Sequence, residues 1–185
     1  MRLLKSFLIL SIAIIGFSFV NVEARTLTAP ADVPQTEIEQ KVFKEILTLP
    51  YYGVFDNIQF KVDGSTVTLY GKVYSLGLTK SAERVVKKID GVDEVVNNIE
   101  MLPPSSLDDS IRRQILRSFS RNGGSLYRYL IEPQPSMRIV VDRGRVSLEG
   151  YVANRGDYNL ANILANGIPG VFSVENNLVI NKEPR

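Results

Sequence analysis

The sequence predicts an α+β fold (an α/β sandwich) of two tandem αββαβ domains, each a mixed three-stranded sheet packed on two helices. Three observations predict it. Matching segments recur at a constant spacing, which indicates an internal duplication. Apolar residues alternate along the expected strands and recur every three or four residues along the expected helices. Glycine and proline separate these segments at the positions where turns are needed.

The duplication is clearest in two pairs of segments. The segment VTLYGKV at 67–73 corresponds to VSLEGYV at 146–152. GVDEV at 91–95 corresponds to GVFSV at 170–174, and in both copies two asparagines and an aliphatic residue follow. The second copy has several extra residues between its first helix and first strand. Because each copy is small for an independent core, we expect the copies to pack together.

The first copy is predicted to run helix, strand, strand, helix, strand. A capping box of Thr36 and Glu39 begins the first helix, and Pro50 ends it. Ser75 is expected to cap the second helix, and in the second copy Asn154 and Asp157 take the cap and N3 positions. The other elements are a strand at 58–62, a turn at Asp63-Gly64, a strand at 67–73, a helix with Leu78, Ala82, Val85 and Ile89 on one face, a turn at Gly91, and a strand at 95–101.

The amino terminus is typical of a secretory signal peptide. Arg2 and Lys5 precede an apolar run at 6–20, and Ala24 suits the last position before cleavage. An uncleaved anchor is the alternative, but the run is short for a membrane span. We expect a periplasmic or secreted protein. The predicted organisation is signal peptide 1–24, N-terminal linker 25–35, first domain 36–102, linker 103–106, second domain 107–181 and tail 182–185.

The composition excludes several kinds of chemistry. The chain has no cysteine and no histidine, so disulfides, thiolate or imidazole catalysis and the usual zinc sites are excluded. A net charge of +2 gives no indication of nucleic-acid binding. The carboxylates Asp63, Asp142, Glu149 and Asp157 show no pairing suited to hydrolysis, and no acidic spacing suits a metal. We therefore expect a non-enzymatic protein without cofactor or metal.

The pattern V-x-L-x-G-x-V, followed by a helix and then G-V-x-x-V-x-N, resembles the BON domain, named for bacterial osmotically inducible and nodulation proteins. Both copies carry it, over roughly residues 36–181. The resemblance implies an αββαβ unit that is often exported and often duplicated. It also implies phospholipid or envelope binding and no catalytic activity.

Four glycines form the structural motif of this pattern. Gly71 and Gly150 lie inside strands, where we expect close approach of a helix, a kink or a bulge. Gly91 and Gly170 are expected in the turns after the second helices. Backbone contact with a ligand is the alternative for the strand glycines. The asparagine pairs at 97–98 and 176–177 are expected to bind nearby backbone rather than a polar ligand.

The first helix of the second copy is unusually basic. Residues 111–131 contain five arginines and no acid. With the aromatic residues that follow, they suit peripheral binding to anionic phospholipid. The candidate lipid-binding or anion-binding residues are Arg112, Arg113, Arg117, Arg121, Arg128, Tyr127 and Tyr129.

Other interpretations of this segment remain open. In one interpretation, the arginines pair with acids of the other copy. In another, the aromatic rings pack on the core. The second functional hypothesis is a protein-binding adaptor or chaperone-like module, with envelope proteins as partners and exposed sheet faces or edges as the binding surface.

Overall fold

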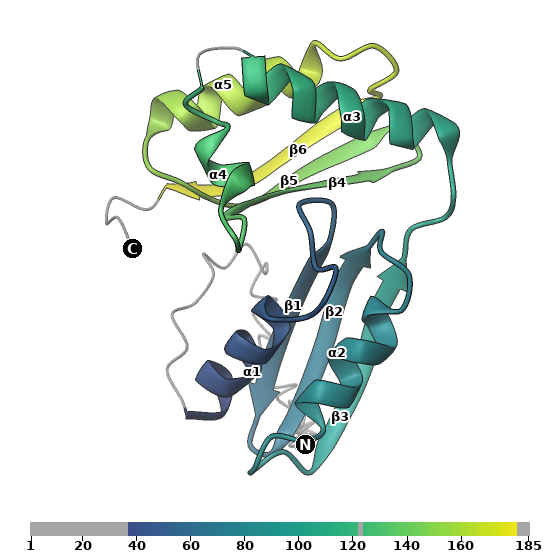
Figure 1. Cartoon of the computed structure of the whole chain (residues 1–185), viewed down its shortest axis with the longest axis vertical. Coiled ribbons are helices and arrows are strands. Elements are labelled where there is room, and N and C mark those ends of the chain that lie inside the picture. Colours follow the sequence, from purple (N-terminus) through teal and green to yellow (C-terminus); the bar gives the residue numbers. More distant parts are fainter. Residues whose placement is uncertain (1–36, 122–123, 181–185) are drawn as a thin grey trace, which may run out of the picture.

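The computed structural model describes residues 37–121 and 124–180, which form two αββαβ units (Figure 1). The predicted signal peptide, the N-terminal linker, Thr36 of the capping box and the tail lie outside the described residues. We call the two units the first repeat and the second repeat.

The first repeat has the predicted order of elements. They are α1 (Glu37–Leu47), β1 (Asn57–Asp63), β2 (Thr66–Val73), α2 (Leu78–Val86) and β3 (Glu94–Met101). The sheet order is β1-β2-β3, with β1 antiparallel and β3 parallel to β2. The mixed three-stranded sheet is therefore confirmed.

One predicted helix cap is wrong. Gly77 precedes α2 and makes no side-chain cap. The hydroxyl of Ser75 instead donates to Oδ2 of buried Asp56, at 2.9 Å. The same carboxylate accepts from the backbone N–H of Tyr74 and of Ser75, so it fixes the path from β2 to α2.

The second repeat follows the same plan with one additional short helix. Its elements are α3 (Ser106–Arg121), α4 (Arg128–Ile131), β4 (Met137–Asp142), β5 (Arg145–Val152), α5 (Arg155–Asn166) and β6 (Ser173–Ile180), with sheet order β4-β5-β6. Part of the extra length of this copy forms α4. The predicted cap of α5 is confirmed, because Oδ1 of Asn154 accepts from the Asp157 N–H at 2.8 Å.

In each repeat the two helices cover one face of the sheet, and the core lies between them (Figure 1). Apolar residues three and four positions apart on the helices meet alternate residues of the strands. The first core includes Val42, Ile46, Val67, Leu69, Ala82 and Val86. The second includes Ile111, Ile115, Phe119, Ile139, Leu148 and Ala161.

The strand glycines allow two neighbouring backbones to approach. A Cβ at Gly71 would lie 2.2 Å from the Asn57 carbonyl oxygen, and one at Gly150 would lie 2.1 Å from that of Ser136. The close neighbour is thus the backbone at the start of the adjacent strand, and the expectation of a helix at this point is wrong. Gly91 and Gly170 lie in the turns after α2 and α5, as predicted.

The repeats pack together through the segment 52–55, which precedes β1. The Val54 carbonyl accepts from the N–H of Ile139 at 2.7 Å, so the segment lies against the outer strand β4. Val54 and Phe55 also pack on the core of the second repeat. Lys72 and Asp142 form an ion pair of 2.5 Å across the same interface. The loop of the first repeat visibly reaches the sheet of the second in Figure 1.

Candidate functional site

The outer side of α3 carries three exposed arginines. Ile111, Ile115 and Phe119 face the core, and Arg113, Arg117 and Arg121 stand on the opposite side at intervals of four residues. We call these three residues the α3 arginine strip. Within residues 37–121 and 124–180, no ion pair involves any of them. The interpretation that they pair with acids of the other copy is therefore not supported among these residues.

Arg112 does not belong to this exposed surface. It is only 2% exposed, and its guanidinium donates to Asp109 and to the carbonyl of Val141. The guanidinium carbon also lies 4.4 Å from the ring centroid of Tyr74 in the first repeat. The prediction that Arg112 binds lipid is corrected, because this side chain is enclosed where the two repeats meet.

Tyr129 and Arg128 belong to a network around Asp157. Tyr129 is 7% exposed, and its hydroxyl donates to Asp157 at 2.6 Å and accepts from the Ala153 N–H. Arg128 pairs with Asp157 at 2.8 Å, although half of its side chain is exposed. The prediction for Tyr129 is therefore corrected, whereas Tyr127 and Arg128 remain accessible.

The hydrogen bonds of this network favour the ionised form of the Asp157 carboxyl group. Burial by itself raises the pKa of Asp157. Hydrogen bonds from Tyr129, Ser125 and Arg128 outweigh that effect, so the pKa lies below its ordinary value. The network ties α4 to the start of α5, and the packing interpretation of the ring holds for Tyr129.

Among the described residues, the long helices α3 and α5 of the second repeat expose positive charge and carry no accessible unpaired acid. On α3, Asp108 is buried and Asp109 pairs with Arg112. The one carboxylate of α5 is the buried Asp157. The first repeat differs, because α1 and α2 carry the ion pairs Glu37–Lys41 and Glu83–Lys87. The fold itself does not require a basic helical face.

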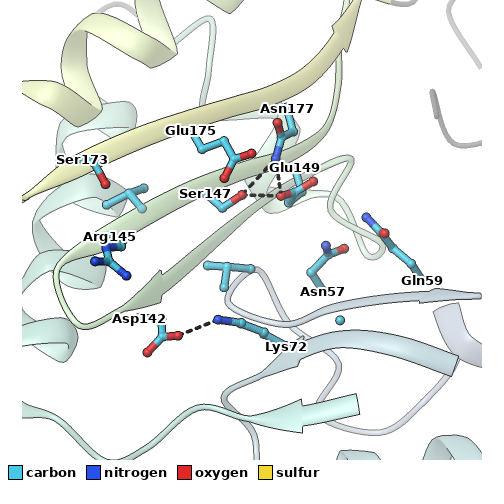
Figure 2. A pocket seen from close by; sticks show the side chains of 13 residues that line it. Asn57, Gln59, Lys72, Asp142, Arg145, Ser147, Glu149, Ser173, Glu175 and Asn177 are labelled. Carbon is cyan, nitrogen blue, oxygen red and sulfur yellow. Dashed lines mark hydrogen bonds and ion pairs between the residues drawn. The ribbon is translucent and has the colours of Figure 1, made fainter. Parts of the chain in front are cut away.

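A polar cleft of about 390 Å³ lies between the repeats (Figure 2). Two candidate carboxylates line it, and both have partners. Asp142 pairs with Lys72, whose hydrogen bond lowers the pKa of the carboxyl group. Glu149 accepts from Asn177 at 2.9 Å and from Ser147. This arrangement holds the carboxylates of Asp142 and Glu149 in place beside their partners. Sequence reasoning missed the cleft, because its two sides come from different repeats.

The first asparagine of each pair joins a helix to a strand. Nδ2 of Asn97 donates to the Thr79 carbonyl, and Nδ2 of Asn176 donates to that of Tyr158. The prediction that these residues bind backbone is confirmed. For Asn177, the second of its pair, the prediction is wrong, because its Nδ2 donates to the side chains of Ser147 and Glu149 at the cleft (Figure 2).

The described residues hold neither a metal cluster nor a membrane span. They contain no group of three or more His, Cys, Asp or Glu side chains placed to hold a metal ion. No helix among them is long and apolar enough to cross a bilayer.

The family model described as BON domain matches residues 34–103 and 107–182. The chain belongs to the BON domain family. Members of the BON family are generally non-enzymatic and are known to bind phospholipids or to be associated with the cell envelope. The two matches agree with the tandem BON architecture described above.

Other comparisons add little to the BON assignment. No curated protein matches the chain. Two solved structures of CdsD, a structural protein of the type III secretion system of Chlamydia trachomatis, are similar to it. The first, its C-terminal domain, has 13% identity over 80% of this chain and 98% of the other, with a TM-score of 0.28. The second has 14% identity over 79% and 93%, with a TM-score of 0.29. These scores are too low to support an argument about fold or function.

Proposed function

We propose that this BON protein is a non-enzymatic, exported envelope protein whose second domain binds peripherally to anionic phospholipid. The observation that supports the proposal is the α3 arginine strip, exposed and without an ion pair in the described residues. Export to the periplasm or beyond the cell rests on the predicted signal peptide.

The charges of the strip suit an anionic surface. Each basic residue near such a surface contributes about 1 kcal/mol to binding. Like charges four residues apart on a helix repel by about 0.2–0.5 kcal/mol per pair, and an anionic surface relieves this repulsion. Binding through Arg113, Arg117 and Arg121 is therefore weak and salt-sensitive.

Protein binding is the second candidate function. The outer strand β3 has one neighbour in its sheet and exposes Val96 and Met101. An edge of this kind can accept an extended segment from a partner in the envelope. Such binding depends on backbone hydrogen bonds and apolar contact, so it persists as ionic strength rises.

Co-sedimentation with vesicles tests the first proposal. Residues 25–185 are mixed with phosphatidylglycerol or phosphatidylcholine vesicles at low and high salt. We expect binding to phosphatidylglycerol alone, reduced by salt and lost in the variant Arg113→Gln, Arg117→Gln, Arg121→Gln.

A matched control removes the same charge from the first repeat. Lys44, Lys80 and Lys88 are exposed on or beside its helices. The variant Lys44→Gln, Lys80→Gln, Lys88→Gln should bind as the unaltered chain does. Equal loss in both variants would attribute binding to net charge, and no binding under any condition would redirect the search to envelope proteins.

A further inference from the structure

The turn between β4 and β5 carries an arginine in a backbone conformation that favours glycine. Arg143 has φ +52°, and the corresponding residue of the first repeat is Gly64, with φ +61°. Residues with a side chain rarely adopt this left-handed region, because Cβ crowds the backbone. A strained residue that the fold does not need points to a role for its side chain.

A buried carboxylate holds this turn in place. Asp108, in the first turn of α3, is 1% exposed. Its Oδ2 accepts from the Arg143 N–H at 2.9 Å, and its Oδ1 accepts from the Gly144 N–H at 2.8 Å. The backbone is therefore fixed while the side chain of Arg143 remains 80% exposed.

Exposed apolar residues lie directly beside this turn. The N–H of Phe172 donates to the Gly144 carbonyl at 2.8 Å, and the Phe172 side chain is 78% exposed. The guanidinium carbon of Arg145 lies 5.8 Å from the centroid of its ring. Leu107, also exposed, lies against the backbone of Gly170, two residues before Phe172. We call Leu107, Arg143, Arg145 and Phe172 the β4–β5 tip.

The first repeat has a different surface at the same place. Its residues corresponding to Arg143, Arg145 and Phe172 are Gly64, Thr66 and Asp93. One copy of the fold thus has a polar, acidic tip and the other a cationic, apolar one. The hairpin and its neighbouring loop form equally in both, so folding does not account for the change.

The nearby acids leave the tip positive. Asp142 is held by Lys72 at 2.5 Å, and its contact with Nε of Arg143 is long, at 3.9 Å. Asp108 is buried and satisfied by backbone N–H groups. Arg145 borders the polar cleft and makes no ion pair among the described residues.

We propose that the β4–β5 tip enters the interfacial region of an anionic bilayer, with Phe172 and Leu107 at the acyl boundary and Arg143 and Arg145 on lipid phosphates. This inference rests on the proposed binding of the second domain to anionic phospholipid. Exposed aromatic and aliphatic side chains flanked by arginine suit that interface, where apolar groups insert and charges remain at the head groups.

The tip lies at the end of the second repeat where α3 begins, and the α3 arginine strip starts farther along the same helix. Leu107 is in the first turn of α3, and Arg113 follows it by about 9 Å along the helix axis. The start of α3 and the turn between β4 and β5 lie at the same end of the second repeat (Figure 1). The strip therefore begins within two helical turns of the tip, with Arg113 turned by roughly 120° around the helix axis from Leu107.

Tryptophan fluorescence tests insertion directly, because the chain contains no tryptophan. In Phe172→Trp, phosphatidylglycerol vesicles should shift the emission to shorter wavelength, and brominated acyl chains should quench it. Leu76 is 84% exposed in the first repeat and serves as the matched position. Leu76→Trp should show neither change.

Affinity gives a second measurement. Phe172→Ser should weaken binding to phosphatidylglycerol vesicles about tenfold, the value of burying much of one aromatic side chain. Arg143→Gly should weaken it about fivefold. Leu76→Ser should bind as the unaltered chain does.

The outcomes separate the two proposals. If the indole of the Phe172→Trp variant stays in water while the chain still sediments and the α3 variant does not, insertion of the tip is overturned and lipid binding stands. Equal shifts in Phe172→Trp and Leu76→Trp overturn it as well. If neither the unaltered chain nor any variant sediments with any vesicle, both proposals fail.

Discussion

The guanidinium carbon of Arg138 lies 3.9 Å from the centroid of the Tyr52 ring, and its Nη1 donates to the Gly53 carbonyl at 2.7 Å. Arg138 is on β4 and Tyr52 is in the segment before β1, so this contact joins the two repeats. Both groups are largely enclosed, which strengthens a cation–π contact relative to one in water. This pair therefore acts together with the Val54–Ile139 hydrogen bond and the Lys72–Asp142 ion pair in placing the repeats.

Arg138→Met should lower the free energy of unfolding by about 2 kcal/mol, because it leaves the Gly53 carbonyl without its donor. A double-mutant cycle with Tyr52→Leu should give a coupling of about 1 kcal/mol, measured by urea unfolding. Arg155 lies over Tyr158 on the surface, so Arg155→Met should change stability by less than about 0.5 kcal/mol. A coupling near zero would remove the role assigned to Arg138.

Gly71→Ala should destabilise the protein by about 3 kcal/mol or more, since the new methyl group overlaps the Asn57 carbonyl. Gly150→Ala should behave alike. Gly77 also has a positive φ but has open space around it, so Gly77→Ala reports backbone strain alone, about 1 kcal/mol. Thermal unfolding of the three variants measures the steric overlap and the backbone strain. An equal loss of stability in all three would contradict the steric explanation.

The stability contributed by Asp157 should depend on pH. Because its folded pKa lies below the ordinary value of 3.8, the contribution is present above that value and is lost as the pH falls through the folded pKa. Asp157→Asn should therefore have a lower free energy of unfolding than the unaltered chain at neutral pH. The difference between the two free energies should narrow below about pH 4. Urea unfolding across this range measures the gap, and a constant difference would exclude ionisation of Asp157 as its cause.

Arg143→Gly should raise the free energy of unfolding by about 0.5–1 kcal/mol, because glycine adopts the left-handed turn without strain. Arg145→Thr removes the same charge from an ordinary strand position and should leave stability within about 0.5 kcal/mol. Calorimetry of both variants checks this. A loss of stability in Arg143→Gly would show that the arginine supports the fold rather than a separate function.

The architecture of each repeat was predictable because its signals are local. Alternation in 67–73 and 146–152, the turns at Gly91 and Gly170, and the Asn154 cap each act within a few residues. The cap assigned to Ser75 failed because buried Asp56, distant in sequence, binds its hydroxyl more effectively than a helix end would.

The candidate site was predictable only in part, because exposure depends on contacts between distant segments. Arg113, Arg117 and Arg121 lie opposite the apolar face, and helical spacing alone places them there. The burial of Arg112 depends on Tyr74 in the other repeat. The β4–β5 tip draws Leu107, Arg143 and Phe172 from three separate segments, which only the folded chain brings together.

The contact between the repeats joins two different surfaces, a loop of one copy and a strand of the other. Such a heterologous contact would continue from molecule to molecule, as a ring or an open filament, if every copy carried both halves. The first repeat has Gln59 where the second has Arg138, and the second has Ile131 where the first has Tyr52. Each copy retains one half, so the contact closes within a single chain and does not repeat from one chain to the next.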